Sequence, residues 1–224
     1  MTDSSISFFQ GTRGSGKTNA AMGELRQVSP LFAIAIRSND WTWMQTFTSF
    51  SDFVYWAASR PRVGKGMQVR FQFGKMDDYI LLFQSMAQSF QNSTIVVDEA
   101  DALYSVPKFV QPLNDLFLGS RNNNLNLYYM SKRPFLVPVL IRSQVDRFVI
   151  FCTEEKRDVD YLSTRTRQQF PKDPFHLAVG EAIVLKKEGQ AWVPRMQKFP
   201  KFSNSSTTTN AGISPARKLI TLKA

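Results

Sequence analysis

The feature that most constrains this chain is a glycine-rich pattern near its start, where residues 11–18 match G-x-x-x-x-G-K-[ST]. The glycines let the backbone curl so that successive N–H groups point at bound phosphates. We expect Lys17 to reach the β- and γ-phosphates of ATP and the Thr18 hydroxyl to bind Mg²⁺. An apolar stretch precedes the pattern and a helical stretch follows it, so the helix start adds its dipole to the site. The predicted ATP-binding residues are Gly11, Thr12, Arg13, Gly14, Ser15, Gly16, Lys17 and Thr18.

Two adjacent carboxylates, Asp98 and Glu99, follow the apolar run at residues 94–97. Ligands of parallel sheets bind at the carboxyl ends of the strands, so we expect both side chains beside the glycine-rich loop. Asp98 can hold Mg²⁺ through the water shell of the ion, because Mg²⁺ takes few protein ligands. Glu99 is placed to orient or deprotonate a water that attacks the γ-phosphate. The alternative is that the pair only caps a helix at the end of the strand.

The hydrophobic pattern predicts an α/β fold, because strand-sized apolar runs alternate with stretches of helical spacing. We expect a mainly parallel sheet sandwiched by helices, followed by a hairpin around residues 188–189. The predicted strands are residues 6–9, 31–36, 67–73, 94–97, 125–130 and 147–152, and the hairpin strands are 183–185 and 191–193. The predicted helices are residues 18–28, 49–59, 77–90 and 108–118.

The charge balance indicates a polyanionic partner. The chain has 224 residues, a formal net charge of +10 and a sequence pI near 9.9. Such an excess favours binding to nucleic acid or to an acidic membrane surface. Residues 189–224 contain no acidic side chain, and residues 203–210 consist only of Ser, Thr and Asn. We therefore expect one domain over residues 1–200 and a flexible, basic tail over residues 201–224.

The cysteine count and the hydropathy constrain the compartment. A single cysteine, Cys152, excludes an internal disulfide and a cysteine-rich metal site. No apolar run approaches the roughly 18 residues of a membrane-spanning helix. The first residues lack the basic stretch and apolar core of a secretion signal. We expect a soluble protein made in a reducing cytoplasm.

Two further sets of residues leave alternatives open. Residues 60–66, with Arg70 and Lys75, form a basic run that is either a channel loop touching DNA phosphates or a solvated hairpin loop. The aromatic side chains of Trp41, Trp43 and Trp56 are more typical of a core or a subunit interface than of a base-stacking surface.

The order of motifs along the chain resembles the FtsK–HerA superfamily of DNA-pumping ATPases. After the glycine-rich loop and the Asp-Glu strand come residues 119–121 (Gly-Ser-Arg) and a strand that ends in residues 131–134 (Ser-Lys-Arg-Pro). That family typically has a Gly-Arg pair and a sensor strand ending in Thr-Gln-Arg-Pro. Residues 138–142 and 146–151 also look like the strand that follows in the family. The small size most resembles the genome-packaging ATPases of tailless, membrane-containing phages of the tectivirus type.

The resemblance implies a single RecA-like P-loop NTPase domain that acts in a homo-oligomeric ring, usually a hexamer. It implies that Lys132 occupies the sensor position, where the family usually has glutamine, so that lysine would act as a point charge. Arg121 matches the arginine that enters the site of the neighbouring subunit, and Arg142 and Arg147 are the fallback candidates. The implied partners are double-stranded DNA and viral capsid vertex or membrane proteins, and the implied locations are the virion and the host cytoplasm during assembly.

Three functions are therefore considered. The first is an ATP-driven translocase that packages double-stranded DNA into a viral capsid. The second is a thymidine-kinase-like phosphotransferase, although such chains usually carry a cysteine-bound zinc that one cysteine cannot supply. The third is a phage assembly factor that binds nucleotide without pumping, against which the intact Glu99 argues.

Overall fold

The buried apolar runs of the sequence form the strands of one sheet. The structure is a computed structural model that describes residues 4–36, 39–59, 66–167 and 169–202. The strands are β1 (Ile6–Gln10), β2 (Leu31–Ala35), β3 (Gln45–Phe47), β4 (Gln68–Phe71), β5 (Thr94–Asp98), β6 (Asn126–Ser131), β7 (Arg147–Ile150), β8 (Glu181–Glu188) and β9 (Ala191–Lys198). The helices are α1 (Lys17–Leu25), α2 (Phe50–Ala58), α3 (Met76–Ser89), α4 (Ala100–Tyr104), α5 (Pro107–Gly119), α6 (Val139–Ser143) and α7 (Lys156–Thr166), with short 3-10 turns η1 (Pro134–Leu136) and η2 (Pro174–His176).

The described strands pair in the order β3-β4-β2-β5-β6-β1-β7-β8-β9. All pairings from β3 to β7 are parallel, whereas β8 and β9 add an antiparallel hairpin to one edge. The predicted α/β fold with a mainly parallel sheet is confirmed. Parallel strands place their carboxyl ends at one edge, so the residues after β1, β5 and β6 meet there.

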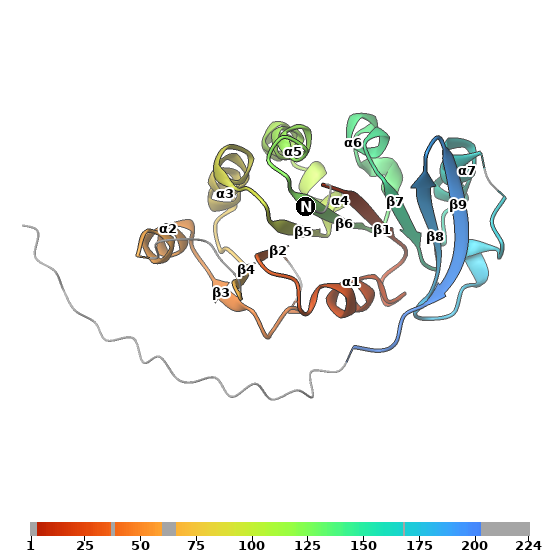
Figure 1. The fold of residues 1–224 in the computed structure, drawn as a ribbon, viewed down its shortest axis with the longest axis horizontal. Coiled ribbons are helices and arrows are strands. Elements are labelled where there is room, and N and C mark those ends of the chain that lie inside the picture. The colour runs from red at the N-terminus through yellow and green to blue at the C-terminus, as the bar shows by residue number, and fades with distance from the viewer. Residues whose placement is uncertain (1–3, 37–38, 60–65, 168, 203–224) are drawn as a thin grey trace, which may run out of the picture.

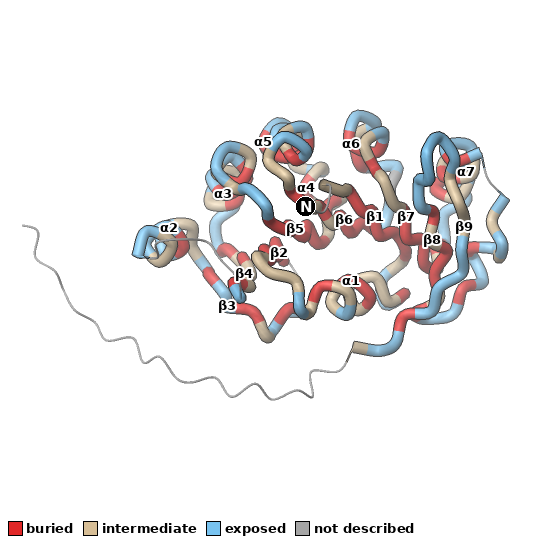
Figure 2. Tube along the Cα trace, viewed as in Figure 1, coloured by how far each residue is buried: buried red, intermediate tan, exposed pale blue. Residues whose placement is uncertain are grey.

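The two faces of the sheet are covered unequally. In Figure 1, α2, α3, α5 and α6 lie along one face, and α1 lies on the other. The tube in Figure 2 shows the central strands buried and the outer sides of these helices exposed. A core cluster lies on each face, and the larger one lies under the several helices.

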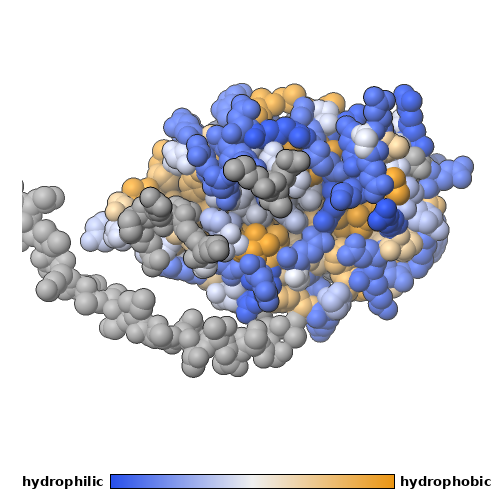
Figure 3. Space-filling model, in the orientation of Figure 1, coloured by the Kyte–Doolittle hydropathy of each residue, from blue (hydrophilic) through white to orange (hydrophobic). Residues whose placement is uncertain are grey.

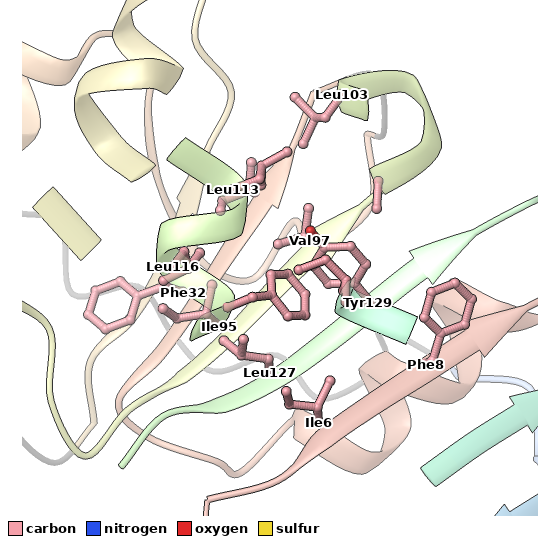
Figure 4. Packing of buried hydrophobic residues seen from close by; sticks show 14 of the residues in the cluster. Ile6, Phe8, Phe32, Ile95, Val97, Leu103, Leu113, Leu116, Leu127 and Tyr129 are labelled. Atoms are coloured by element: carbon pink, nitrogen blue, oxygen red, sulfur yellow. The ribbon is translucent and has the colours of Figure 1, made fainter. Parts of the chain in front are cut away.

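Aromatic and branched side chains of the central strands fill the larger core, as Figure 4 shows. Phe8 of β1 packs against Tyr129 of β6, with ring centroids 6.2 Å apart. Phe117 of α5 meets Tyr129 edge-on at 4.2 Å, which ties the helix layer to the sheet. Burial of a side chain of this size contributes about 1.5–3 kcal/mol, so these contacts hold the strand ends of the site in place.

The outer surface carries both hydrophilic and apolar side chains. On the face seen in Figure 3, hydrophilic side chains predominate, and apolar ones form separate patches. Within the described ranges, no helix combines the length and apolar character needed to cross a bilayer.

The two edge strands of the sheet offer little to a further strand. At one edge, β3 has only three residues. At the other edge, β9 carries Pro194, Arg195 and Lys198, and its side chains are mostly exposed. Proline cannot donate a ladder hydrogen bond, and exposed cations on an edge oppose further pairing.

Several elements were not predicted from the sequence. These are β3 and the helices α4, α6 and α7, all of which are short or, for α7, rich in charge. The apolar residues 135–141, which are of strand length, form η1 and the start of α6 instead, and the strand expected from the family resemblance begins only at Arg147. Pro138 provides the physical reason, because it immediately precedes α6 and has no N–H to donate to a ladder. Residues 60–65 of the predicted basic run 60–66 lie outside the described residues, as do residues 203–224 of the tail predicted over residues 201–224.

Candidate nucleotide-binding site

The glycine-rich loop joins the central strand β1 to helix α1. Gly11 has a φ of 152° and lies so close to its neighbours that an added Cβ would stand 2.7 Å from the Cβ of Phe151. The loop is tied down by the Thr12 N–H, which donates to the Cys152 carbonyl at 2.8 Å, and by the Ser15 hydroxyl, which donates to the Thr12 carbonyl at 2.8 Å. Gly16, with a φ of 107°, is the residue from which α1 begins. The loop is thus fixed by its backbone, as a phosphate cradle requires.

Lys17 lies folded over this loop. Its ammonium group donates to the carbonyl oxygens of Gly11 at 2.6 Å and Thr12 at 2.7 Å. Burial lowers the pKa of Lys17 to about 8, and the charge of Asp98 partly opposes this effect. A cation held by neutral carbonyls in a partly dehydrated place is well suited to receive phosphate oxygens.

Asp98 is the last residue of β5 and is almost fully buried. Burial raises the pKa of its carboxyl to about 6. Its Oδ2 atom has no hydrogen-bond partner among the described residues. A buried carboxylate oxygen without a partner, in the same cavity as the Thr18 hydroxyl, fits a Mg²⁺ ion held through water.

Glu99 follows at a sharp backbone turn. Its φ of 55° and ψ of 45° are in the left-handed region, which non-glycine residues rarely adopt. The carboxylate Oε1 atom lies 3.3 Å from the ammonium group of Lys132, which follows the parallel strand β6. The Lys132 N–H also donates to Asp101 of α4 at 3.4 Å. The strand ends of β5 and β6 are therefore joined through the two residues predicted to act on the γ-phosphate.

One cavity of about 1090 Å³ collects most of the predicted residues. Of the residues predicted to act on ATP or Mg²⁺, it is lined by Arg13, Gly14, Gly16, Lys17, Thr18, Asp98, Glu99 and Lys132. Gly11, Thr12 and Ser15 belong to the loop but do not line the cavity. The cavity also has lining residues that were not predicted from the sequence, namely Asn19 and Met22 of α1, Asn39 and Asp40 after β2, Met130 of β6, Val179 and Gly180 before β8, and Phe199, Lys201 and Phe202 after β9.

The three candidate arginines lie elsewhere in the described part of the chain. Arg121 follows α5, and its guanidinium group pairs with Asp146 at 3.0 Å. Arg142 is buried and stacks over the ring of Tyr161 at 4.1 Å. Arg147 pairs with Glu24 of α1 at 2.7 Å. None of the three lines the cavity.

No group of three or more His, Cys, Asp or Glu side chains placed to hold a metal occurs within the described ranges. His176 pairs with the neighbouring Asp173, and Cys152 is a free thiol whose Sγ donates to the Phe175 carbonyl. Trp41 is fully buried in the smaller core, with Trp43 packed against it, and Trp56 packs against the larger core.

Comparison with known proteins reveals similarity of fold. No family model matches the chain, and no curated protein matches its sequence. Among solved structures, the chain is similar to the genome packaging NTPase B204 of Sulfolobus turreted icosahedral virus 2 in complex with AMPPCP, with a TM-score of 0.66 and 17% identity over 89% of this chain and 100% of that one. The B204 DNA-packaging ATPase of Sulfolobus turreted icosahedral virus gives a TM-score of 0.66 at 14% identity over 89% of this chain and 100% of that one. EssC (ATPases 2 and 3) of Geobacillus thermodenitrificans gives 0.56 at 12% identity over 91% of this chain and 41% of that one.

Proposed function

We propose that this protein is an ATP-driven motor that packages double-stranded DNA into a viral capsid. The observation that carries the proposal is the single cavity that unites Lys17, Thr18, Asp98 and Glu99 at the strand ends of this fold. The similarity in fold to a viral packaging NTPase over its whole length supports the genome-packaging role. A role in the virion and in the host cytoplasm during assembly, with capsid vertex or membrane proteins as partners, belongs to the same proposal.

In the proposed mechanism, each described side chain of the site has a separate role in hydrolysis. The loop backbone and Lys17 hold the phosphates. Thr18 and Asp98 would hold Mg²⁺, which neutralises charge that develops on the phosphates. Glu99 orients the attacking water and accepts its proton. Lys132 holds the Glu99 carboxylate from the neighbouring strand end and adds positive charge beside the γ-phosphate.

The DNA partner is supported by the charge of the chain, which is +10 overall. Lysine and arginine side chains that neutralise phosphates release counterions, and such binding is independent of sequence but falls steeply with salt. The test is ATP hydrolysis with and without duplex fragments of unrelated sequence, together with filter binding at 50 mM and 200 mM salt.

We expect duplex DNA to stimulate hydrolysis and its affinity to fall by about tenfold or more between the two salt concentrations. Affinity that does not change with salt would contradict electrostatic binding. Hydrolysis that responds to thymidine, with a phosphorylated nucleoside as product, would identify a kinase instead. Nucleotide binding without turnover would identify an assembly factor.

The position of Arg121 supports a ring of subunits. Its guanidinium group is half exposed and lies outside the cavity of its own chain, so a head-to-tail neighbour is needed to bring it to a γ-phosphate. A transition-state arginine of this kind contributes several kcal/mol to lowering the barrier, about 10³-fold or more in rate.

Mixed oligomers test this arrangement. Arg121→Ala alone and Glu99→Gln alone should each be nearly inactive, whereas equal mixtures should regain hydrolysis at interfaces that combine one intact Glu99 with one intact Arg121. Asp146→Asn is the matched control, because it breaks the same ion pair from the other side and leaves the arginine in place. If that variant is as inactive as Arg121→Ala, or if proven co-assembly restores nothing, Arg121 acts only within its own subunit.

A further inference from the structure

The four residues after β9, Phe199 to Phe202, cross the N-terminal part of α1, and we call them the C-terminal strap. Figure 1 shows the chain leaving the β8–β9 hairpin and passing beneath α1. The strap starts at Phe199, whose N–H donates to the Gly180 carbonyl at 2.8 Å and whose ring packs 5.6 Å from that of Phe151. Gly180 in turn donates to the Ser15 carbonyl of the glycine-rich loop at 3.0 Å. The strap is thus attached to the loop through a single residue.

Asn19 fixes the middle of the strap. Its side-chain amide donates to the Pro200 carbonyl at 2.8 Å, and its amide oxygen accepts the N–H of Phe202. The amide nitrogen and the amide oxygen of Asn19 therefore both bond to the strap backbone. Asn19 directly follows Thr18 in the sequence. Two hydrogen bonds from one rigid amide fix position as well as distance.

Phe202 ends the strap against a second aromatic side chain. Its ring centroid lies 5.1 Å from that of Trp43, and the guanidinium group of Arg26 lies 4.5 Å over the same Trp43 ring. The Phe202 ring is therefore held by packing, although it belongs to the last described residue of the chain. These contacts fix the position of the strap relative to α1 and the glycine-rich loop.

The strap lines the same cavity as the catalytic residues. In the proposed site, Glu99 and Lys132 lie beside the γ-phosphate and the glycine-rich loop holds the other phosphates, and all of them contribute to this cavity. Met22 and Val179 also line the cavity, together with Phe199, Lys201 and Phe202 of the strap. Apolar side chains with one or two polar groups are what a base and a sugar require of a pocket.

We propose that the C-terminal strap, together with Val179, is the wall that binds the nucleoside part of ATP. The proposal rests on the nucleotide site described above and names the residues that contact the nucleoside of the bound ATP. Phe202 and Val179 provide apolar contact for the base, Lys201 adds positive charge at this end, and Asn19 is a positioning residue that holds the strap.

Calorimetric titration of the full chain with ATP and, separately, with inorganic tripolyphosphate tests this assignment. Phe202→Ala should weaken ATP binding by about tenfold, because it removes a large apolar contact. Asn19→Ala should weaken it by about threefold to tenfold through loss of two hydrogen bonds that order the strap. Tripolyphosphate, which has no nucleoside, should bind both variants within about twofold of the parent. Phe175→Ala is the control, because Phe175 is an exposed phenylalanine that does not line the cavity.

Unfolding temperatures of all variants, measured without ligand, identify any variant that has lost the fold. If Phe202→Ala has lost it, Phe202→Leu replaces that variant in the titrations. Equal losses for ATP and tripolyphosphate, or unchanged ATP affinity in both strap variants, would overturn the proposal. A parent protein that binds neither ligand would overturn the nucleotide site itself. A parent that binds ATP through the strap but does not respond to DNA would contradict only the packaging function.

Discussion

In the proposed site, the part that holds the phosphates (the phosphate end) and the part that holds the nucleoside (the strap end) are built from different parts of the chain. At the phosphate end, Lys17 bonds to carbonyls only five and six residues away, and the loop that it covers is one continuous stretch. At the strap end, Asn19 bonds to residues 181 and 183 positions away. The contacts of Lys17 are local, whereas the contacts of Asn19 require that the sheet be complete out to β9. A change at the phosphate end should affect the chemistry or the binding of the phosphates, and a change at the strap end should affect how firmly the nucleoside is held.

The largest effect is expected from Glu99→Gln, which breaks the chemistry of the phosphate end and leaves its shape. The amide cannot accept the proton of the attacking water, so turnover should fall by about 10²–10⁴-fold. ATP affinity should stay close to that of the parent, because Glu99 does not hold the phosphate loop. Single-turnover hydrolysis and calorimetry measure the two quantities. Near-normal turnover would mean that another residue positions the water.

A smaller effect is expected from Lys17→Ala, which breaks binding at the same end. Loss of charge-assisted hydrogen bonds of about 1.5–3 kcal/mol corresponds to roughly tenfold to hundredfold weaker nucleotide binding. Unlike the strap variants, this one should weaken ATP and tripolyphosphate alike. Titration with both ligands measures the ratio, and unchanged affinity for either would contradict the assignment of the site.

The smallest effect is expected from Gly16→Ala, at the point where the two ends touch. Gly16 has a φ of 107°, and an added Cβ would lie 3.1 Å from the Gly180 nitrogen. We expect the free energy of unfolding to fall by about 1–2 kcal/mol, which lowers the unfolding temperature by about 2–8 °C. Gly74→Ala is the control, because Gly74 has no positive φ and no atom within 4 Å of an added Cβ. Equal unfolding temperatures of the two variants, measured by calorimetry, would show that position 16 tolerates a side chain.

The same contrast explains which parts of the site could be predicted from the sequence. The glycine-rich loop is a local pattern, so its residues and its place between a strand and a helix could be read directly. Asp98 and Glu99 could be placed beside it because parallel strands end at one edge. Lys132 was predicted from the order of motifs along the chain, and the structure places its ammonium group beside Glu99. The roles predicted for these side chains remain predictions.

The strap could not be predicted, because nothing in a run such as Phe-Pro-Lys-Phe reveals which distant helix it will cross. The available signal was two phenylalanines at residues 199 and 202, just before a stretch without apolar side chains. Helix α7 was missed for a different reason. Its buried residues, Asp158, Leu162 and Thr166, have helical spacing but only one of them is apolar. Hydrophobic periodicity does not detect a helix that buries polar groups.

The short, proline- and cation-bearing edges of the sheet restrict how copies of this protein can associate. Among the described residues, β3 has only three residues at one edge and β9 carries Pro194, Arg195 and Lys198 at the other, so neither edge favours pairing with a strand of another copy. In the proposed ring, subunits would then meet through side chains, whose contacts can be made and broken one interface at a time. Continuous backbone pairing would lock neighbouring subunits into one rigid ribbon. Subunits that meet only through side chains can tilt against one another while the sheet inside each of them stays unchanged.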